Sequence, residues 1–209
     1  MKSYARLVAM NLAVRKTMTL AEFLEWEARQ ELRYEFDGET PVAMAGGTFA
    51  HAAIQRNLAL AIGGRLRGKP CKFVGSDLKI EVAGSSRYPD GFVVCSPVAN
   101  DAIIINDPVV IFEVLSPITA STDRTIKARE YQATPSVQRY VMLEQDRIAA
   151  TAYVRADGDW NVHVLLNEAV LAMPEIGVEF PLAELYEGLD LTPNADQDDR
   201  ATSDQTSDR

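Results

Sequence analysis

Two acidic residues stand in stretches of this 209-residue chain that are otherwise apolar. Asp90 precedes a strand-like run, and Glu113 interrupts the apolar run 109–115. Such a run predicts a strand buried on both faces, where an ionised carboxylate is costly unless it is paired or binds a metal. Glu113 has the strand parity of Ile111 and Leu115, so we expect its side chain to point to the same face as theirs.

A lysine that follows these acids adds to the predicted site. Lys127 lies in a stretch with helical character, on one predicted helix face with Arg124 and Tyr131. Carboxylate oxygens are the ligands that Mg²⁺ and Mn²⁺ prefer, so Asp90 and Glu113 predict a site for one such ion beside Lys127. The alternative is a buried ion pair between Glu113 and Lys127, or an arginine, with only a structural role.

Length and composition indicate one globular domain with two terminal extensions. With 47% hydrophobic residues the chain can bury a sizeable core, and no run approaches the ~18 apolar residues of a membrane-spanning helix. We expect residues 1–17 to form an N-terminal extension and residues 18–191 to form the folded domain. The segment 192–209 is rich in Asp and nearly free of apolar residues, which predicts a disordered acidic tail.

Cysteine and histidine are scarce in this chain. Cys71 and Cys95 are too few for a disulfide framework. Both lie in strand-like runs, so we expect free, buried thiols in a protein of the reducing cytoplasm. A Ser-His-Asp hydrolase and a zinc site have little support, because His51 and His163 are the only histidines, no G-x-S-x-G motif is present and zinc-ligand spacing is lacking.

A local basic strip lies within an acidic chain. The formal net charge is −9, which argues against indiscriminate nucleic-acid binding. The segment 65–87, however, carries six basic residues against two acidic ones, a local charge of +4. Such a strip is suited to a phosphate backbone, and the alternative is a solvated helix end and strand edge. Its basic residues are Arg65, Arg67, Lys69, Lys72, Lys79 and Arg87.

The order of helical and strand-like segments predicts an α+β fold, with a mixed sheet and helices on one or both of its faces. A capping box at 19–22 begins the first helix, a hairpin turn is expected at Asp37-Gly38, and Ser121 or Thr122 can cap the third helix. Helices are predicted over 19–30, 49–66, 123–132 and 181–186. Strands are predicted at 72–74, 78–82, 91–95, 109–115, 138–143, 149–154 and 161–166.

Five short motifs occur in one order along the chain and together resemble a known family. They are Tyr34-Glu35-Phe36-Asp37-Gly38-Glu39, His51-x-x-Ile54-x-x-Asn57-Leu58, Pro89-Asp90, Glu113-Val114-Leu115-Ser116-Pro117 and Asp123-Arg124-x-x-Lys127-x-x-x-Tyr131. Over residues 18–191 this order resembles the Uma-type putative restriction endonuclease family, a branch of the PD-(D/E)XK nuclease superfamily. The resemblance implies a restriction-endonuclease-like α+β fold, whose central mixed sheet is flanked by helices and carries the acidic residues.

The resemblance implies roles for four catalytic residues. Asp90 corresponds to the Asp of the PD motif, and Glu113 corresponds to its second acid. The superfamily's lysine usually follows that acid by two residues. Leu115 stands there in this chain, so the resemblance implies that Lys127 of the next helix takes its place. Glu35 matches an acid near the N-terminal hairpin that completes such sites.

The implied function is that of an Mg²⁺- (or Mn²⁺-) dependent DNA endonuclease with no membrane partner. Asp90, Glu113 and a backbone carbonyl near Val114 would hold the metal, and cutting both strands of a duplex suggests a homodimer. The alternatives are a catalytically idle DNA-binding or assembly protein that keeps the fold, and a hydrolase of another substrate on the same metal site. DNA contacts are predicted for Arg65, Arg67, Lys69 and Arg124.

Overall fold

The structure is a computed structural model, and it describes residues 17–44, 46–116 and 119–191. The predicted N-terminal extension, apart from Thr17, and the predicted tail 192–209 lie outside the described residues. Within the described part, a mixed sheet with helices on both faces confirms the predicted α+β class.

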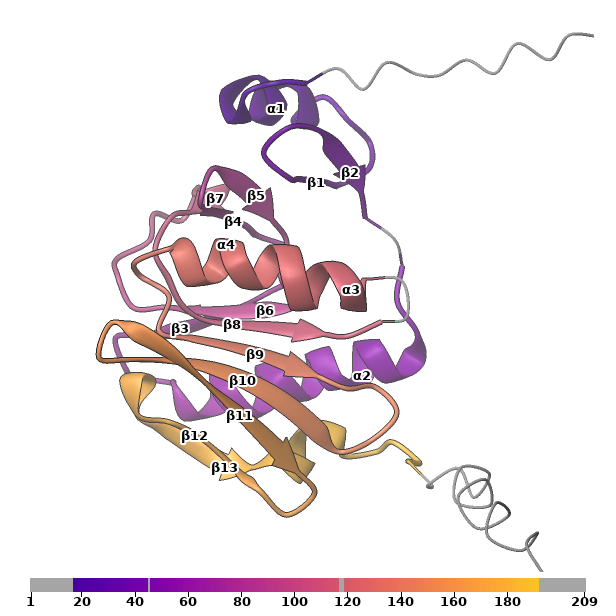
Figure 1. Cartoon of the computed structure of the whole chain (residues 1–209), viewed down its shortest axis with the longest axis vertical. Helices are drawn as coiled ribbons and strands as arrows, with labels where there is room; N and C mark the ends of the chain where they lie inside the picture. Colours follow the sequence, from indigo (N-terminus) through magenta and orange to yellow (C-terminus); the bar gives the residue numbers. More distant parts are fainter. Residues whose placement is uncertain (1–16, 45, 117–118, 192–209) are drawn as a thin grey trace, which may run out of the picture.

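A six-stranded mixed sheet forms the centre of the fold (Figure 1). Neighbouring strands of this sheet pair antiparallel, with one exception. The strands formed by residues 108–114 and 139–143 pair in parallel. All six strands were among the seven predicted segments, and the seventh, at 78–82, belongs to a second sheet. From one edge to the other the strands are β11 (Asp159–Leu166), β10 (Ala149–Ala156), β9 (Arg139–Leu143), β8 (Pro108–Val114), β6 (Gly91–Val94) and β3 (Lys72–Gly75).

A smaller five-stranded sheet carries the N-terminal hairpin (Figure 1). The turn predicted at Asp37-Gly38 is confirmed: Gly38 has a φ of 91°, and Asp37 Oδ1 accepts the backbone N–H of Thr40 at 2.7 Å. Two strands of this sheet were not predicted: Ser85-Ser86-Arg87 lacks the apolar pattern of a strand, and Ile104-Ile105 is only two residues long. In order, the strands are β2 (Pro41–Ala43), β1 (Tyr34–Phe36), β5 (Ser85–Arg87), β4 (Lys79–Val82) and β7 (Ile104–Ile105).

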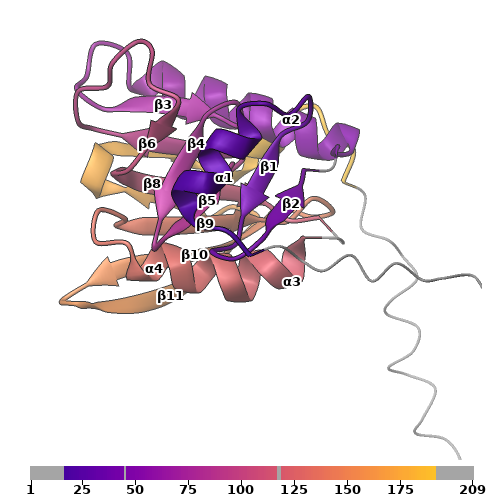
Figure 2. The same cartoon turned by 90° about the horizontal axis from the view of Figure 1, so that it is seen from above.

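Helices cover the two faces of the large sheet (Figure 2). On one side lies α2 (Phe49–Leu58), which continues as the π-helical turn η1 (Ala59–Gly63). On the other side lies a helix made of α3 (Ala120–Thr122), the π-helical turn η2 (Asp123–Lys127) and α4 (Ala128–Ala133). π-helical turns are frequent at functional sites, and η2 carries the predicted lysine.

The remaining elements lie near the two ends of the described part of the chain. α1 (Leu20–Glu27) begins with the predicted capping box, in which Thr19 and Glu22 exchange hydrogen bonds. The helix predicted over 123–132 begins earlier than expected, at Ala120, so the expected caps Ser121 and Thr122 lie inside it. No helix within the described ranges is both long and apolar enough to cross a membrane. The other elements are β12 (Val170–Met173), η3 (Pro174–Ile176), β13 (Val178–Pro181) and η4 (Leu182–Tyr186).

β8 is buried from both sides, and this arrangement places Glu113. Phe112 and Val114 pack in the cluster that contains the apolar residues of α2, whereas Ile111 packs in the cluster that contains Tyr131 of α4. Glu113 is 4% exposed, and its carboxylate accepts a hydrogen bond from the Tyr131 hydroxyl. The predicted parity is therefore confirmed, since Glu113 points to the same face as Ile111.

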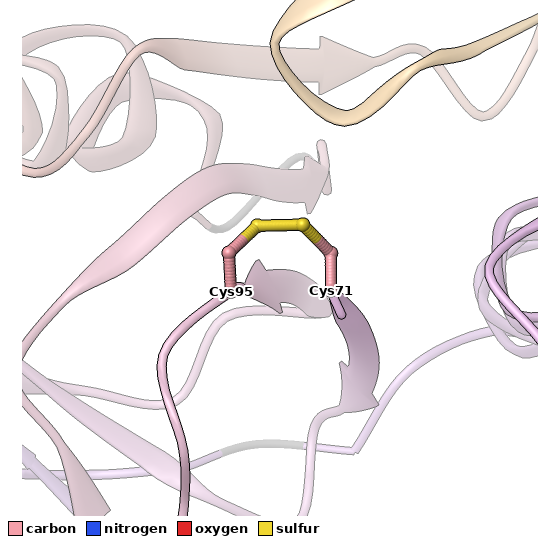
Figure 3. The surroundings of a disulfide bond; sticks show 2 residues. All are labelled: Cys71 and Cys95. Carbon is pink, nitrogen blue, oxygen red and sulfur yellow. A yellow bond between two sulfur atoms is a disulfide. The ribbon is translucent and has the colours of Figure 1, made fainter. Parts of the chain in front are cut away.

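The two cysteines form a disulfide, so the prediction of free thiols is wrong (Figure 3). Cys71 directly precedes β3 and Cys95 directly follows β6, and the antiparallel register pairs Lys72 with Val94. The cysteines therefore stand opposite each other, with Cα atoms 3.9 Å apart. The sequence could not indicate this pairing, because the partners are 24 residues apart and meet only through the strand register. The cytoplasmic localisation loses its argument from free thiols and stays a prediction.

Candidate active site

Asp90 lies where α2, β6 and β8 meet. Its Oδ2 atom accepts the backbone N–H of Val114 at 2.6 Å, and its Oδ1 atom accepts a hydrogen bond from Gln55 Nε2 at 2.6 Å. The Nε2 atom of His51, one turn earlier on α2, lies 3.3 Å from the same Oδ1 atom. The carboxylate is therefore held by a strand on one side and by a helix on the other.

The residue after Asp90 is a glycine because a ring occupies the space beside it. A Cβ atom on Gly91 would come within 2.5 Å of the Phe73 ring on the neighbouring strand β3. Glycine at this position leaves room for the Phe73 ring against the start of β6.

Glu113 makes two buried hydrogen bonds through one oxygen. Its Oε1 atom accepts from Lys127 Nζ at 3.0 Å and from the Tyr131 hydroxyl at 2.8 Å. Burial raises the pKa of Glu113 well above the usual range; Lys127 lowers it, and the carboxylate of Asp90 raises it further. The predicted pair of acids therefore lies close enough for Asp90 to influence Glu113, although Asp90 precedes β6 and Glu113 lies within β8.

Lys127 is surrounded by carboxylates. Besides Glu113, its Nζ atom lies 3.2 Å from Glu35 Oε1 and 3.2 Å from Asp123 Oδ1. Burial alone would lower the pKa of Lys127, but the three neighbouring carboxylates outweigh burial and raise it. The amine is therefore a charged ammonium group inside the protein, held between β8, β1 and its own helix.

Glu35 reaches Lys127 from β1 of the smaller sheet. In addition to Lys127, it accepts the backbone N–H of Tyr88 at 3.1 Å and lies 3.3 Å from Arg87 Nη1. Arg87 is itself 2% exposed and binds Glu130 through two hydrogen bonds of 2.8 and 2.7 Å. These contacts fix Glu35 so that one of its oxygens faces the ammonium group.

Asp123 is a fourth acid of the cluster, and the sequence reasoning assigned it no role. Its side chain is buried, and its Oδ1 atom makes no hydrogen bond with the described residues, although Lys127 lies at ion-pair distance. We interpret this contact as a Coulombic one whose alignment is too poor for a hydrogen bond. The spacing of four residues between Asp123 and Lys127 on a helix was the signal that could have identified it.

The predicted DNA-contact residues are not all brought to this site. Arg65, Arg67 and Lys69 lie at the far end of the α2–η1 helix from His51, about 20 Å away at the rise of an α-helix. Arg65 pairs with Glu184 at 2.9 Å, and Lys69 Nζ donates to a backbone carbonyl at 3.0 Å. Arg124 lies close to the site, since it precedes Lys127 by one helical turn, and it pairs with Glu144 at 2.6 Å.

The basic strip is not one continuous surface. Lys79 and Arg87, which contribute two of its charges, are 6% and 2% exposed. Lys79 pairs with Glu27, and Arg87 pairs with Glu35 and Glu130. The expected strip is therefore corrected to its exposed members at the helix end and the start of β3, because the charge count along a sequence does not distinguish exposed cations from buried ones.

The donors of this cluster suit a hard divalent cation. In the part of the chain that the structure describes, no three His, Cys, Asp or Glu side chains are grouped closely enough to hold a metal ion. The predicted set is smaller, since Asp90 and Glu113 supply carboxylates and Val114 supplies a backbone carbonyl. Three carboxylates surround the ammonium group of Lys127, and Asp90 acts on one of them, Glu113. Carboxylate and carbonyl oxygens are the donors that Mg²⁺ and Mn²⁺ prefer, and the metal site stays a prediction.

The fold is shared with a solved protein. A crystal structure described as that of a "putative nuclease belonging to DUF820", from Anabaena variabilis, matches with a TM-score of 0.68 and 19% sequence identity. The match covers 81% of this chain and 97% of that one. The chain therefore has the α+β fold of that protein, which confirms the predicted architecture.

The sequence comparisons define the family. Residues 20–183 match the family model Uma2, described as "Putative restriction endonuclease". A Synechocystis protein named "Uncharacterized protein slr1290" is 34% identical over 173 residues, which cover 80% of this chain and 90% of that protein. Another, "Uncharacterized protein sll1609", is 26% identical over 165 residues, covering 76% and 93%. This chain belongs to the Uma2 family, as its five motifs indicated.

Proposed function

We propose that this protein is a metal-dependent DNA endonuclease that hydrolyses phosphodiester bonds with Mg²⁺ or Mn²⁺. The observation that carries the proposal is the approach of Lys127 to Glu113, at 3.0 Å, beside Asp90. Glu113 of β8 and Lys127 of the covering helix meet in the interior, and Asp90, from the turn before β6, raises the pKa of Glu113. The membership of the Uma2 family supports the same reaction, and DNA is the substrate that its description implies.

Each residue of the cluster has a proposed role. Asp90, Glu113 and the Val114 carbonyl would hold the cation, which when bound would polarise the phosphate and acidify a water molecule. Lys127 would place its ammonium group beside the phosphate and stabilise negative charge as it develops. Glu35 pairs with Lys127 at 3.2 Å, so we assign it the role of orienting this ammonium group.

The basic residues at the end of the α2–η1 helix would hold the DNA backbone. They lie about 20 Å from the site, which corresponds to about six base pairs at 3.4 Å each. A duplex that runs along this helix would therefore contact the strip and the acidic cluster together. Arg124 would contact the backbone near the cleaved bond. These DNA-binding residues are Arg65, Arg67, Lys69 and Arg124.

We further propose a homodimer in which two copies pair through β11. Among the described residues this strand is the last of the large sheet, so one row of its backbone groups has no neighbouring strand there. Val162, Val164 and Leu166 are 55%, 68% and 55% exposed on one face of it. Antiparallel pairing of two copies would join these apolar residues. Asp159 is the one acidic residue of the strand and lies at its end. In an antiparallel pair of strands it would therefore lie far from Asp159 of the partner subunit.

The second candidate is a catalytically idle DNA-binding or assembly protein. One observation favours it: Asp90 already accepts hydrogen bonds from Val114 and Gln55, and Glu113 already has Lys127. Such a cluster could persist as a purely structural one. A rise in melting temperature on adding Mn²⁺ would favour the endonuclease, whereas the idle protein should show none.

A cleavage assay tests the proposed function. The full chain is incubated with supercoiled plasmid and with single-stranded DNA, in Mg²⁺, in Mn²⁺ and in EDTA. We expect nicked and linear products with either metal and none in EDTA. The Asp90→Asn variant is assayed in parallel, and cleavage by this variant at the wild-type rate would assign the activity to a contaminant. Absence of cleavage of either DNA in both metals would contradict the proposal.

A further inference from the structure

We propose that the Glu144 carboxylate holds the place of a DNA phosphate in the protein without DNA, and that its partners Arg124 and Arg147 bind that phosphate in the complex. The inference rests on the proposed function, because it takes DNA as the partner. It adds to that function a phosphate-binding subsite, the contact residue Arg147 and a carboxylate that DNA must displace. The proposed metal has no part in it.

One carboxylate oxygen lies beside both arginines. Arg124 Nη2 is 2.6 Å from Glu144 Oε1, and Arg147 Nη2 is 3.6 Å from the same atom. The two guanidinium groups come from different elements, since Arg124 belongs to η2 and Arg147 to the turn between β9 and β10. A guanidinium group matches the geometry of carboxylates and phosphates alike. Two arginines that converge on one carboxylate can therefore converge on one phosphate.

Glu144 lies close to the acidic cluster. Met142 of β9 pairs with Glu113 of β8 in the parallel register, and Glu144 follows Met142 by two residues, so it belongs to the face of the sheet that Glu113 faces. Its contact with Arg124, from the helix that covers this face, agrees with that placement. Two residues along a strand and one strand across correspond to about 8 Å. At 3.4 Å of rise per nucleotide, a phosphate held here lies about two nucleotides from the cleaved bond.

The turn that carries Arg147 is hydrogen-bonded to the elements beside the site. It lies at the end of the sheet where α2 begins and where α3 covers the strands (Figure 1). Gln145 Nε2 donates to the backbone carbonyl of Leu115 at 2.6 Å, and the Thr48 hydroxyl donates to Gln145 Oε1 at 2.5 Å. These two bonds join the turn to the end of β8 and to the start of α2. Arg147 therefore extends from a backbone that is attached to the elements of the candidate site.

The pairing of Glu144 is open to solvent, so a phosphate can displace it. The side chains of Arg124 and Arg147 are 45% and 66% exposed. Exposed ion pairs contribute little net stability and are screened by salt. By contrast, the side chains of Lys127 and Glu113 are 6% and 5% exposed, and breaking a buried pair is costly. The exchange of a carboxylate for a phosphate is therefore assigned to the exposed pair.

An acid of the same turn provides a matched comparison. Asp146 is exposed and lies two residues after Glu144. Glu144→Gln and Asp146→Asn change the net charge of the protein equally, but only Glu144→Gln also frees two guanidinium groups from their carboxylate. A difference in DNA affinity between these two variants thus reports the exchange at the arginines and not the net charge.

The test is fluorescence anisotropy of a labelled DNA duplex with the full chain, in EDTA and at several salt concentrations. We expect Glu144→Gln to bind about fivefold more tightly than the wild type, the equivalent of one exposed ion pair. Asp146→Asn should change the affinity by less than about twofold, since salt screens charges that do not contact the phosphate. Arg147→Gln should weaken binding and lower the slope of log affinity against log salt by about 1. Glu144→Gln should add less affinity in the Arg147→Gln background, because the two residues interact.

The possible outcomes distinguish this inference from the proposed function. Equal affinities of Glu144→Gln and Asp146→Asn, or an unchanged affinity and slope of Arg147→Gln, would overturn the inference. Absence of duplex binding by the wild type would overturn it as well. The expected affinities without cleavage in either metal would overturn the endonuclease and leave the phosphate subsite standing. Should Glu144→Gln fail to fold, Arg147→Gln decides, because its side chain is 66% exposed.

Discussion

The ammonium group of Lys127 lies 3.0 Å from the carboxylate of Glu113, although 14 residues separate them in the sequence. Leu115, which stands where the superfamily usually places its lysine, is instead part of the apolar cluster beneath α4. The chain returns through α3 and η2, and this return brings a cation to the acid from the helix that covers the sheet. A lysine that is distant in the sequence thus lies beside the acid in the fold.

Glu113→Gln is expected to abolish cleavage and to leave the protein folded. The amide keeps the shape of the side chain and replaces the carboxyl group of Glu113, whose pKa is raised by burial and by neighbouring carboxylates. We therefore expect the melting temperature of the metal-free protein to stay the same or to rise. Differential scanning calorimetry measures this, with exposed Glu179→Gln as the control. An unfolded Glu113→Gln variant would show that the acid is a structural ion-pair partner.

The hairpin turn should show a pH-dependent contribution to stability through Asp37. Burial raises the pKa of Asp37, but hydrogen bonds from the backbone of Thr40 and Glu39 outweigh it, so the pKa lies below its ordinary value. A lowered folded-state pKa stabilises the fold above the ordinary pKa of about 4, and this contribution is lost as the pH falls through the folded value.

Asp37→Asn should therefore be less stable than the wild type at pH 7, and the difference should shrink as the pH falls below about 4. Urea unfolding at a series of pH values measures the difference, with exposed Asp101→Asn as the control. A difference that is constant across this range would show that the charge of Asp37 does not contribute.

Much of this architecture could be predicted from local patterns, because apolar runs and capping residues act on neighbours in sequence. Glu113 and Lys127 were found in this way, from an acid in a buried strand and a lysine on a helix. Asp123 could have been found from its helical spacing to Lys127. The contact of His51 with Asp90 could not, since it depends on how α2 packs against the sheet, which no local pattern specifies.

The same limit explains the wrong predictions. The cysteine pair depends on strand register, which local sequence did not determine here. The prediction of a basic strip was wrong where a basic residue is buried, as Arg87 is. Its partners Glu35 and Glu130 lie 52 and 43 residues away in the sequence. Charge counts along a chain describe a surface only after the fold has assigned each cation to the surface or the interior.

Charge reversal at the end of the α2–η1 helix should weaken DNA binding with little dependence on sequence. Arg67→Glu with Lys69→Glu removes two exposed cations, so the slope of log affinity against log salt should fall by about 1 for each phosphate that the protein no longer neutralises. Fluorescence anisotropy of a labelled duplex at several salt concentrations measures this. Arg29→Glu, at an exposed position after α1, is the control. Unchanged affinity and slope would place the DNA on another face.

A charge on β11 should separate the proposed dimer. Val164 is 68% exposed on the edge strand, and Val164→Lys would bring two like charges together at the paired edges. We expect a dimer for the wild type and a monomer for the variant by sedimentation velocity. Leu60→Lys, at a residue that is 67% exposed on the other side of the sheet, should remain a dimer. A monomeric wild type would remove the proposed interface.

The most direct test of the central claim combines metal titration and single-turnover cleavage of DNA by Lys127→Ala. Removal of the ammonium group leaves Glu113, Glu35 and Asp123 without their shared cation, so a stability loss of about 3–5 kcal/mol is expected, and both measurements are made where the variant is folded. We predict cleavage slower by roughly 10²–10³, undiminished Mn²⁺ affinity, and poor rescue by Lys127→Arg. Cleavage at the wild-type rate, or loss of metal binding by the folded variant, would contradict the account.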